Sequence, residues 1–274
     1  MKKVIILLFA AISSVGVSAQ VTHEFLINGG VGLSALNYKL PEGKKNLGIG
    51  GDCGIGYSCF FHEQWGIGIG VDLGFYNTKA ILDNVQLISS GLQDSENDRF
   101  DMYSTLMNYT EKQKAMFLNI PLILQFQTKG TQKFYANAGV KIGLPLSCKF
   151  SVSDATIINK GYYPDYDNWL EMPGFAGFGT FANYNSTGKL KLGLAAMLTL
   201  EAGGKWKLGE KVSLYTGIYF DYGLNNTLKD KEQPFVNYTN TQPAEFTTNS
   251  AIPSLTAKIS PIAVGFKLRL ALVK

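Results

Sequence analysis

The sequence predicts an all-β protein, an eight-stranded antiparallel up-and-down transmembrane β-barrel. Three observations lead to this fold class. Apolar residues alternate with small or polar ones, with a period of two, in eight separate segments. Short and long connections between these segments strictly alternate. Aromatic residues stand at the segment ends beside the short connections, where a membrane interface favours them.

The composition excludes several other classes of protein. Of 274 residues, 46% are hydrophobic and only 17% are charged, against about 25% charged in an ordinary soluble domain. The mean hydropathy is +0.03, yet the chain has no run of about 18 apolar residues, so it has no membrane-spanning helix. The many aromatic residues exclude a disordered chain. A net charge of +4 gives no reason to expect nucleic acid as a partner.

The first residues have the pattern of a secretory signal peptide. Lys2 and Lys3 supply the positive end, residues 4–11 the apolar stretch, and Val17-Ser18-Ala19 the small-residue cleavage site. We therefore expect a signal peptide over residues 1–19 and a single barrel domain over residues 20–274.

The three cysteines predict neither a disulfide nor a metal site. Cys53 and Cys59 lie in one predicted strand, about 20 Å apart at 3.3 Å per residue, which is too far for them to pair. Cys148 alone offers no framework, and no clustered Cys/His spacing is present. We expect no metal and no cofactor.

The first three segments alternate most clearly. Glycine, serine or aspartate occupies nearly every position between the apolar residues of the second and third segments, so each predicts a strand with one apolar face and one small or polar face. The apolar positions are Phe25, Ile27, Val31 and Leu33; then Leu47, Ile49, Cys53, Ile55, Tyr57, Cys59 and Phe61; then Trp65, Ile67, Ile69, Val71, Leu73 and Phe75.

Five further segments follow the same rule. Their apolar faces comprise Met116, Leu118, Ile120, Leu122, Leu124 and Phe126; Phe134, Ala136, Ala138, Val140, Ile142 and Leu144; Leu192, Leu194, Ala196, Leu198, Leu200 and Trp206; Val212, Leu214, Ile218, Phe220 and Tyr222; and Ile262, Val264, Phe266, Leu268, Leu270 and Leu272.

The connections determine the predicted topology. The short ones are residues 62–64, 129–132 and 208–211, and the long ones are residues 37–46, 79–113, 149–189 and 225–257. Both ends of the chain then lie on the short-turn side. This arrangement is typical of an outer-membrane barrel with tight periplasmic turns and long outer loops.

A soluble barrel of the lipocalin type, with its apolar faces turned inward, is the alternative. It does not account for the long connections or for the aromatic residues at the strand ends, which are Phe25, Phe61, Trp65, Phe126, Phe134 and Trp206. A closed barrel in lipid also pairs every backbone donor and acceptor, as a membrane requires. The membrane barrel is therefore the preferred interpretation.

Two neighbouring segments resemble those of a known family. Phe117-Leu118-Asn119-Ile120-Pro121-Leu122-Ile123-Leu124 and Phe134-Tyr135-Ala136-Asn137-Ala138-Gly139-Val140 resemble consecutive strands of the PorT-like outer-membrane β-barrel proteins of Bacteroidota, small barrels of the OmpA/OmpX type. The resemblance covers the mature chain as a strand pattern and implies a location in the bacterial cell outer membrane. It permits a role as an envelope component of a protein secretion apparatus. The C-terminus departs from the usual pattern, because it ends in Leu272-Val273-Lys274 rather than in an aromatic residue.

Four acids and four bases fall on the inward faces of the predicted strands. Because an unpaired buried charge is costly, we expect them to pair across the lumen, Lys141 near Glu201 and Asp221 near Lys267 and Arg269, without leaving a wide pore. A structural charge network is the preferred interpretation, and an ion-selective constriction is the alternative. The set is Asp52, Asp72, Lys141, Lys191, Glu201, Asp221, Lys267 and Arg269.

The sequence gives little sign of catalysis. Its two histidines, His23 and His62, fall at the short-turn side, and no serine or cysteine is placed to form a nucleophile pair with them. The alternating glycines match no phosphate-binding motif. We expect no enzyme activity and no catalytic residue.

The long connection 149–189 is rich in aromatic residues that could bind a glycan or protein outside the cell, or could instead pack the loops together. Asp165 and Asp167 lack the spacing of a calcium loop.

The expected partners are outer-membrane lipid and an extracellular glycan or protein ligand, and the chain is expected to be a monomer. The expected role is structural or surface-interacting, and a narrow transport channel is an alternative. The candidate binding residues are Tyr162, Tyr163, Tyr166, Trp169, Phe175, Phe178, Phe181 and Tyr184.

Overall fold

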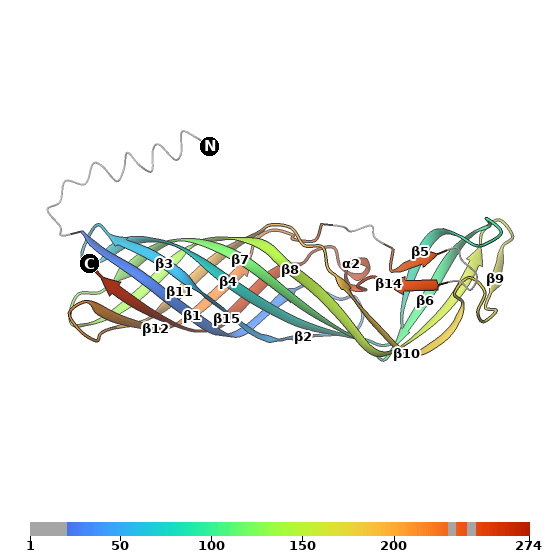
Figure 1. Cartoon of the computed structure of the whole chain (residues 1–274), viewed down its shortest axis with the longest axis horizontal. Coiled ribbons are helices and arrows are strands. Elements are labelled where there is room, and N and C mark those ends of the chain that lie inside the picture. Colours follow the sequence, from blue (N-terminus) through green and yellow to red (C-terminus); the bar gives the residue numbers. More distant parts are fainter. Residues whose placement is uncertain (1–20, 230–233, 240–244) are drawn as a thin grey trace, which may run out of the picture.

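A computed structural model describes residues 21–229, 234–239 and 245–274 (Figure 1). The expected signal peptide, residues 1–19, lies outside the described residues. No helix in the described ranges is long and apolar enough to cross a membrane.

Eight antiparallel strands form a closed hydrogen-bonded ring, which confirms the predicted fold class. Each strand pairs with the next one around the ring, and the pairings of β15 with β1 and of β8 with β11 complete the closure. The short turns and the C-terminus gather at one end of the barrel (Figure 1). The ring consists of β1 (Thr22–Asn37), β3 (Ile49–Phe60), β4 (Trp65–Leu82), β7 (Tyr109–Gln127), β8 (Gln132–Tyr163), β11 (Ala195–Lys207), β12 (Val212–Gly223) and β15 (Ser260–Val273).

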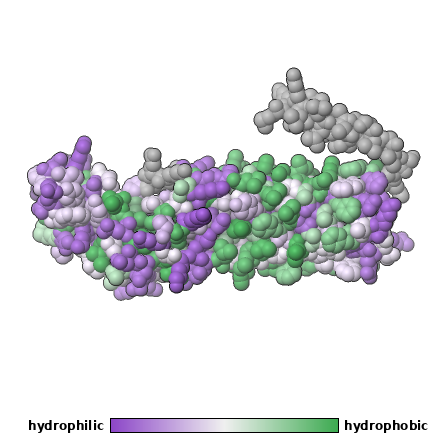
Figure 2. Space-filling model, turned by 180° about the vertical axis from the view of Figure 1, so that it is seen from behind, coloured by the Kyte–Doolittle hydropathy of each residue, from purple (hydrophilic) through white to green (hydrophobic). Residues whose placement is uncertain are grey.

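The alternation places apolar side chains on the outside of the barrel. Ile27, Ile55 and Phe266 are 61%, 64% and 72% exposed, as only a lipid-facing surface tolerates. Figure 2 shows hydrophobic side chains gathered in a green band across the visible face of the barrel wall. Small residues make room on the inside: a Cβ atom at Gly30 would lie 3.0 Å from Asp52 Oδ1 and 3.1 Å from Tyr219 Cε1.

Much of the chain expected as loops is folded as sheet. β4, β7 and β8 continue beyond the hydrophobic band, and the outer part of β8 pairs with β6 on one side and with β10 and β9 on the other. We name residues 79–113, 149–189, 234–239 and 245–255 the extension. Its further elements are β5 (Val85–Gln93), β6 (Arg99–Met107), β9 (Asn168–Leu170), β10 (Gly179–Lys189), β13 (Val236–Thr239), β14 (Glu245–Thr248) and α2 (Ile252–Leu255); β2 (Lys44–Leu47) pairs with β4 just below them.

The extension has its own hydrophobic core. Phe100, Tyr163 and Phe178 are buried there, and the ring of Phe100 packs edge-on against that of Phe178 at 5.4 Å. β5 is the outermost strand of this sheet, and no strand of the described residues pairs with its free side.

A second apolar cluster, which we call the plug, closes the end of the lumen beneath the extension. It brings inward residues of the wall, such as Phe117 and Met197, against residues from outside the ring. Those outside residues are Tyr38, Leu190, Leu192, Leu228, Ile252 and Ile259.

The buried carboxylate of Glu111 fastens α2 over the plug. It accepts hydrogen bonds from Ser250 Oγ at 2.5 Å, Ala251 N at 2.9 Å, Gln113 Nε2 at 3.0 Å and Tyr109 OH at 3.1 Å. Burial raises the pKa of Glu111, against the opposing effect of these donors.

We predict that α2 is held more firmly at acidic than at alkaline pH. A raised pKa means that the folded state binds the proton more tightly, so stability is lost as pH rises from about 4.5 through the folded-state pKa. Hydrogen exchange of the α2 amides, corrected for intrinsic rates, should show this loss. Glu111→Gln should abolish the pH dependence, whereas the exposed control Glu42→Gln should keep it. An unchanged pH dependence in Glu111→Gln would contradict the assignment.

Candidate functional site

Four buried ion pairs fill the middle and the short-turn end of the lumen. Lys141 Nζ lies 2.6 Å from Asp221 Oδ2, and Lys267 Nζ lies 3.0 Å from Asp52 Oδ2. Arg269 pairs with Glu201, and Lys205 Nζ lies 2.6 Å from Glu24 Oε1. Each pair joins strands separated by at least one other strand of the ring, so the pairs cross the lumen.

Buried tyrosines add hydrogen bonds to two of the four carboxylates. Tyr215 OH donates to Glu24 Oε2 at 2.6 Å, and Tyr135 OH donates to Glu201 Oε1 at 2.7 Å. Lys267 Nζ also lies 5.3 Å from the centre of the Tyr219 ring. The carboxylates of Glu24 and Glu201 are therefore both paired and hydrogen bonded by tyrosine, whereas Asp52 Oδ1 and Asp221 Oδ1 have no hydrogen-bond partner besides the ion pair made by the other oxygen of each group.

Seven of the eight residues expected in the lumen lie there, and the eighth does not. Lys191 is exposed because β11 begins only at Ala195, so the residues before it have left the barrel wall. Leu192, expected to face lipid, is buried in the plug for the same reason. Asp72 is not in one of the four ion pairs and accepts a hydrogen bond from Asn28 Nδ2 at 3.1 Å.

The expected partners within the lumen were wrong. Lys141 pairs with Asp221 rather than lying beside Glu201, and Arg269 takes Glu201. The strands of a barrel are tilted and staggered, so equal distances from the short turns do not correspond to equal positions across the lumen. Sequence reasoning also missed Glu24 and Lys205, although both occupy inward positions of the alternation.

Little free space remains in this polar layer. A cavity of about 30 Å³ lies among residues that include Asn28, Asp72 and Lys141, which is room for about one water molecule. A larger hollow of about 800 Å³ opens at the short-turn end and is lined by Glu24, Lys205 and neighbouring turn residues. The ion pairs and the plug therefore separate this mouth from the extension.

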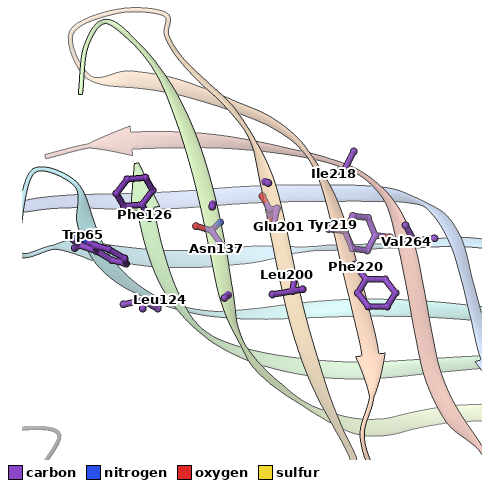
Figure 3. A pocket seen from close by; sticks show the side chains of 13 residues that line it. Trp65, Leu124, Phe126, Asn137, Leu200, Glu201, Ile218, Tyr219, Phe220 and Val264 are labelled. Carbon is purple, nitrogen blue, oxygen red and sulfur yellow. The ribbon is translucent and has the colours of Figure 1, made fainter. Parts of the chain in front are cut away.

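A third hollow, of about 540 Å³, lies on the lipid-facing wall (Figure 3). Its lining includes Ala136, Ala138 and Ala202. Trp65 and Phe126 lie at one end of it and Ile218 and Phe220 at the other. Its apolar lining suits lipid rather than a polar ligand.

The eight aromatic residues proposed as a binding loop divide between core and surface. Tyr163 and Phe178 are buried in the core of the extension, Phe175 and Tyr184 pack against it, and Phe181 packs on Phe246. Tyr163 and Phe178 are therefore wrong as surface-binding candidates, because the long connection folds as sheet around them. The side chains of Phe175, Phe181, Tyr184 and Tyr162 are half-buried, and those of Tyr166 and Trp169 are exposed.

Tyr103, Tyr162 and Trp169 form an aromatic platform on the outer face of the extension. The Trp169 ring lies 4.8 Å from that of Tyr103 and 5.0 Å from that of Tyr162. Register explains the grouping, since Tyr162 is opposite Trp169, and Tyr103 is opposite Lys160, two residues along the same strand. Tyr103 could not be found from the sequence because its strand was expected as a loop.

The surroundings of the platform are acidic. Residues 94–101 and 160–171 hold seven acids and two bases. One base, Lys160, is paired with Glu171 at 2.5 Å. Asp167 accepts a hydrogen bond from Tyr162 OH at 2.8 Å, and Asp98 accepts one from Tyr166 OH at 3.2 Å.

The two histidines lie at the opposite end of the molecule. His23 Nδ1 is 2.6 Å from Tyr57 OH, and His62 occupies the turn between β3 and β4. Neither lies near the platform.

We predict that breaking one lumen pair destabilises the barrel strongly. Lys141→Met leaves Asp221 buried and uncompensated, at a cost of about 3–5 kcal/mol. Urea unfolding in micelles, followed by gel mobility, should show this loss, and Lys141→Met/Asp221→Leu should recover most of it. The exposed control Lys207→Met should change little. A double variant as unstable as the single one would contradict the pairing.

A family model described as the outer membrane protein beta-barrel domain matches residues 18–229. No curated protein matches the chain.

Three solved structures show low similarity. Ail, the attachment invasion locus protein of Yersinia pestis, solved in complex with the heparin analogue sucrose octasulfate, is 8% identical, with 93% of this chain and 99% of that chain covered and a TM-score of 0.33. Neisserial surface protein A is 9% identical, with coverages of 91% and 97% and a TM-score of 0.34. A major outer membrane protein from Thermus thermophilus is 12% identical, with coverages of 92% and 99% and a TM-score of 0.36. Because the family model matches more than half of the chain, this protein belongs to the outer membrane protein beta-barrel domain family and is a protein of the bacterial outer membrane.

Proposed function

We propose that this protein is a closed, non-enzymatic outer-membrane barrel that binds a glycan or protein outside the cell through its extension. The observation that carries the proposal is the folded extension itself, a sheet with its own core (Figure 1) that stands beyond the hydrophobic band (Figure 2). Outer-membrane barrels turn their short connections to the periplasm, which places this sheet on the extracellular side.

The exposed features of the extension suit contacts with another molecule. The aromatic platform presents Trp169, 49% exposed, beside two tyrosines. Large aromatic rings of this kind supply contact area at low conformational cost. The free side of β5 adds unpaired backbone groups to which an extended segment could bind.

The lumen offers less support for transport. All but one of its identified charges are in ion pairs, its central cavity is about 30 Å³, and the plug lies between these pairs and the extension. A narrow channel therefore requires the plug to move, and steady large conductance of the purified protein in planar bilayers would favour this channel function.

The resemblance to PorT-like proteins supports a third role, as an envelope component of a secretion apparatus, which co-purification with other envelope proteins would reveal.

The β5–β6 hairpin of the extension, which carries Tyr103 of the aromatic platform and the free side of β5, can be removed where the structure already provides a closing point. Leu82 and Tyr109 are register partners of β4 and β7, so an Asn-Gly turn between them replaces residues 83–108 with a tight hairpin. We predict that the full chain in lipid nanodiscs binds at least one member of a glycan and secreted-protein array, and that the shortened chain loses this binding by at least about tenfold (about 1.4 kcal/mol).

Heat-modifiable gel migration serves as the folding control for the shortened barrel. Lys207→Met, a change at the short-turn end, should leave binding intact. Absence of any binding by the full chain, or equal binding by the shortened chain, would contradict the proposed function.

A further inference from the structure

Five lysines stand side by side on the outer wall, where the barrel leaves the hydrophobic band. On β4 and β7, Lys79 is directly opposite Lys112. On β7, β8 and β10, Lys149 is directly opposite both Lys114 and Lys189. We call these five residues the lysine row. Four of them are exposed, and Lys79 is half-buried.

The row brings like charges together without compensation from the protein. Side chains directly opposite each other on a sheet have Cβ atoms about 4.5–5.5 Å apart, and like charges in such positions are destabilising. Within the described ranges, no acidic side chain forms an ion pair with any of the five lysines. The five lysines therefore form a concentrated positive surface.

The position of the row relates it to the membrane. On β7, Lys114 lies two residues nearer to the extension than Met116. On β8, Lys149 lies three residues nearer to the extension than Leu146, which is 52% exposed in the hydrophobic band. Figure 2 shows hydrophilic side chains directly beside the green band on the side of the extension. Lipid headgroups lie at this level.

We propose that the lysine row binds the phosphate groups of lipid headgroups in the outer leaflet. Phosphate oxygens accept charge-assisted hydrogen bonds from ammonium groups, and lysines near an anionic membrane surface contribute about 1 kcal/mol each. Three adjacent strands present Lys114, Lys149 and Lys189 in one line, so a headgroup carrying phosphate can bridge lysines that would otherwise repel each other. The ligand removes the cross-strand repulsion and holds the barrel at a fixed depth.

The test uses the full chain in phosphatidylcholine nanodiscs containing lipid A with both phosphate groups, or lipid A from which both have been removed. Lipid retained per barrel, measured by native mass spectrometry over a series of lipid concentrations, gives the affinity. The variant is Lys114→Gln/Lys149→Gln/Lys189→Gln. The matched control, Lys129→Gln/Lys207→Gln/Lys211→Gln, removes the same charge at the short-turn end.

The phosphorylated lipid should bind the wild type more tightly than the dephosphorylated lipid, and the variant should lose about fivefold in affinity for each lysine replaced. Lys114→Arg/Lys149→Arg/Lys189→Arg should retain binding. In discs without lipid A the glutamine variant should melt at a higher temperature than the wild type, because like-charge repulsion is relieved. A higher melting temperature of the variant that binds lipid A more weakly also excludes misfolding as the cause of its lost affinity.

Three results would overturn the proposal. One is equal binding of phosphorylated and dephosphorylated lipid A. Another is an equal loss of affinity in the short-turn control. The third is displacement of the lipid by inorganic phosphate beyond the effect of chloride at equal ionic strength, which would assign the row to free phosphate instead of lipid.

Discussion

Backbone groups within a membrane have no water to bond to, and this constraint shapes the rest of the molecule. An open sheet of these eight strands would expose the edges of β1 and β15 to lipid, whereas their pairing over fourteen residue positions removes both edges. Closure of the barrel then determines the character of its outer and inner surfaces. The outer one must be apolar, and the inner one must fit the narrow interior of an eight-stranded barrel.

The narrow lumen explains both the glycines and the charges. Gly30 leaves the space that Asp52 and Tyr219 occupy, and Asp52 in turn holds Lys267. Most charges at this depth are matched by an opposite charge, and Asp72 instead accepts a hydrogen bond from Asn28. The same packing that stabilises the wall therefore seals it, and the extension is left as the part available to other molecules.

Alternation in the sequence predicts the barrel wall well, because a period of two maps directly onto the two faces of a strand. It identifies inward residues such as Asp221 and outward ones such as Ile55 without knowledge of their partners. It fails where the chain leaves the wall, as at Lys191 and Leu192. Partners across the lumen depend on tilt and stagger, which no local pattern records.

The extension also shows that a local sequence pattern does not predict contacts that form only in the folded sheet. In β6 and the outer part of β8 burial alternates regularly, but residue type does not follow it, because the polar Ser104 and Asn159 lie on the buried face while Tyr103 lies on the other. The pairing of Tyr103 with Trp169 follows from strand registers fixed only in the folded sheet. Of the aromatic residues in residues 149–189, the sequence could not separate Phe178, which forms core, from Trp169, which is exposed.

A sealed lumen is the central claim, and cysteine labelling from the two sides of the membrane tests it most directly. In a variant lacking the three native cysteines, a single cysteine is introduced at Thr199, which is buried in the lumen. A second variant carries it at Ser213, in the short-turn mouth. With the protein in liposomes, a small charged thiol reagent should label position 213 from the short-turn side and leave position 199 unlabelled from either side. Rapid labelling of position 199 from both sides would show a continuous aqueous path and contradict the account.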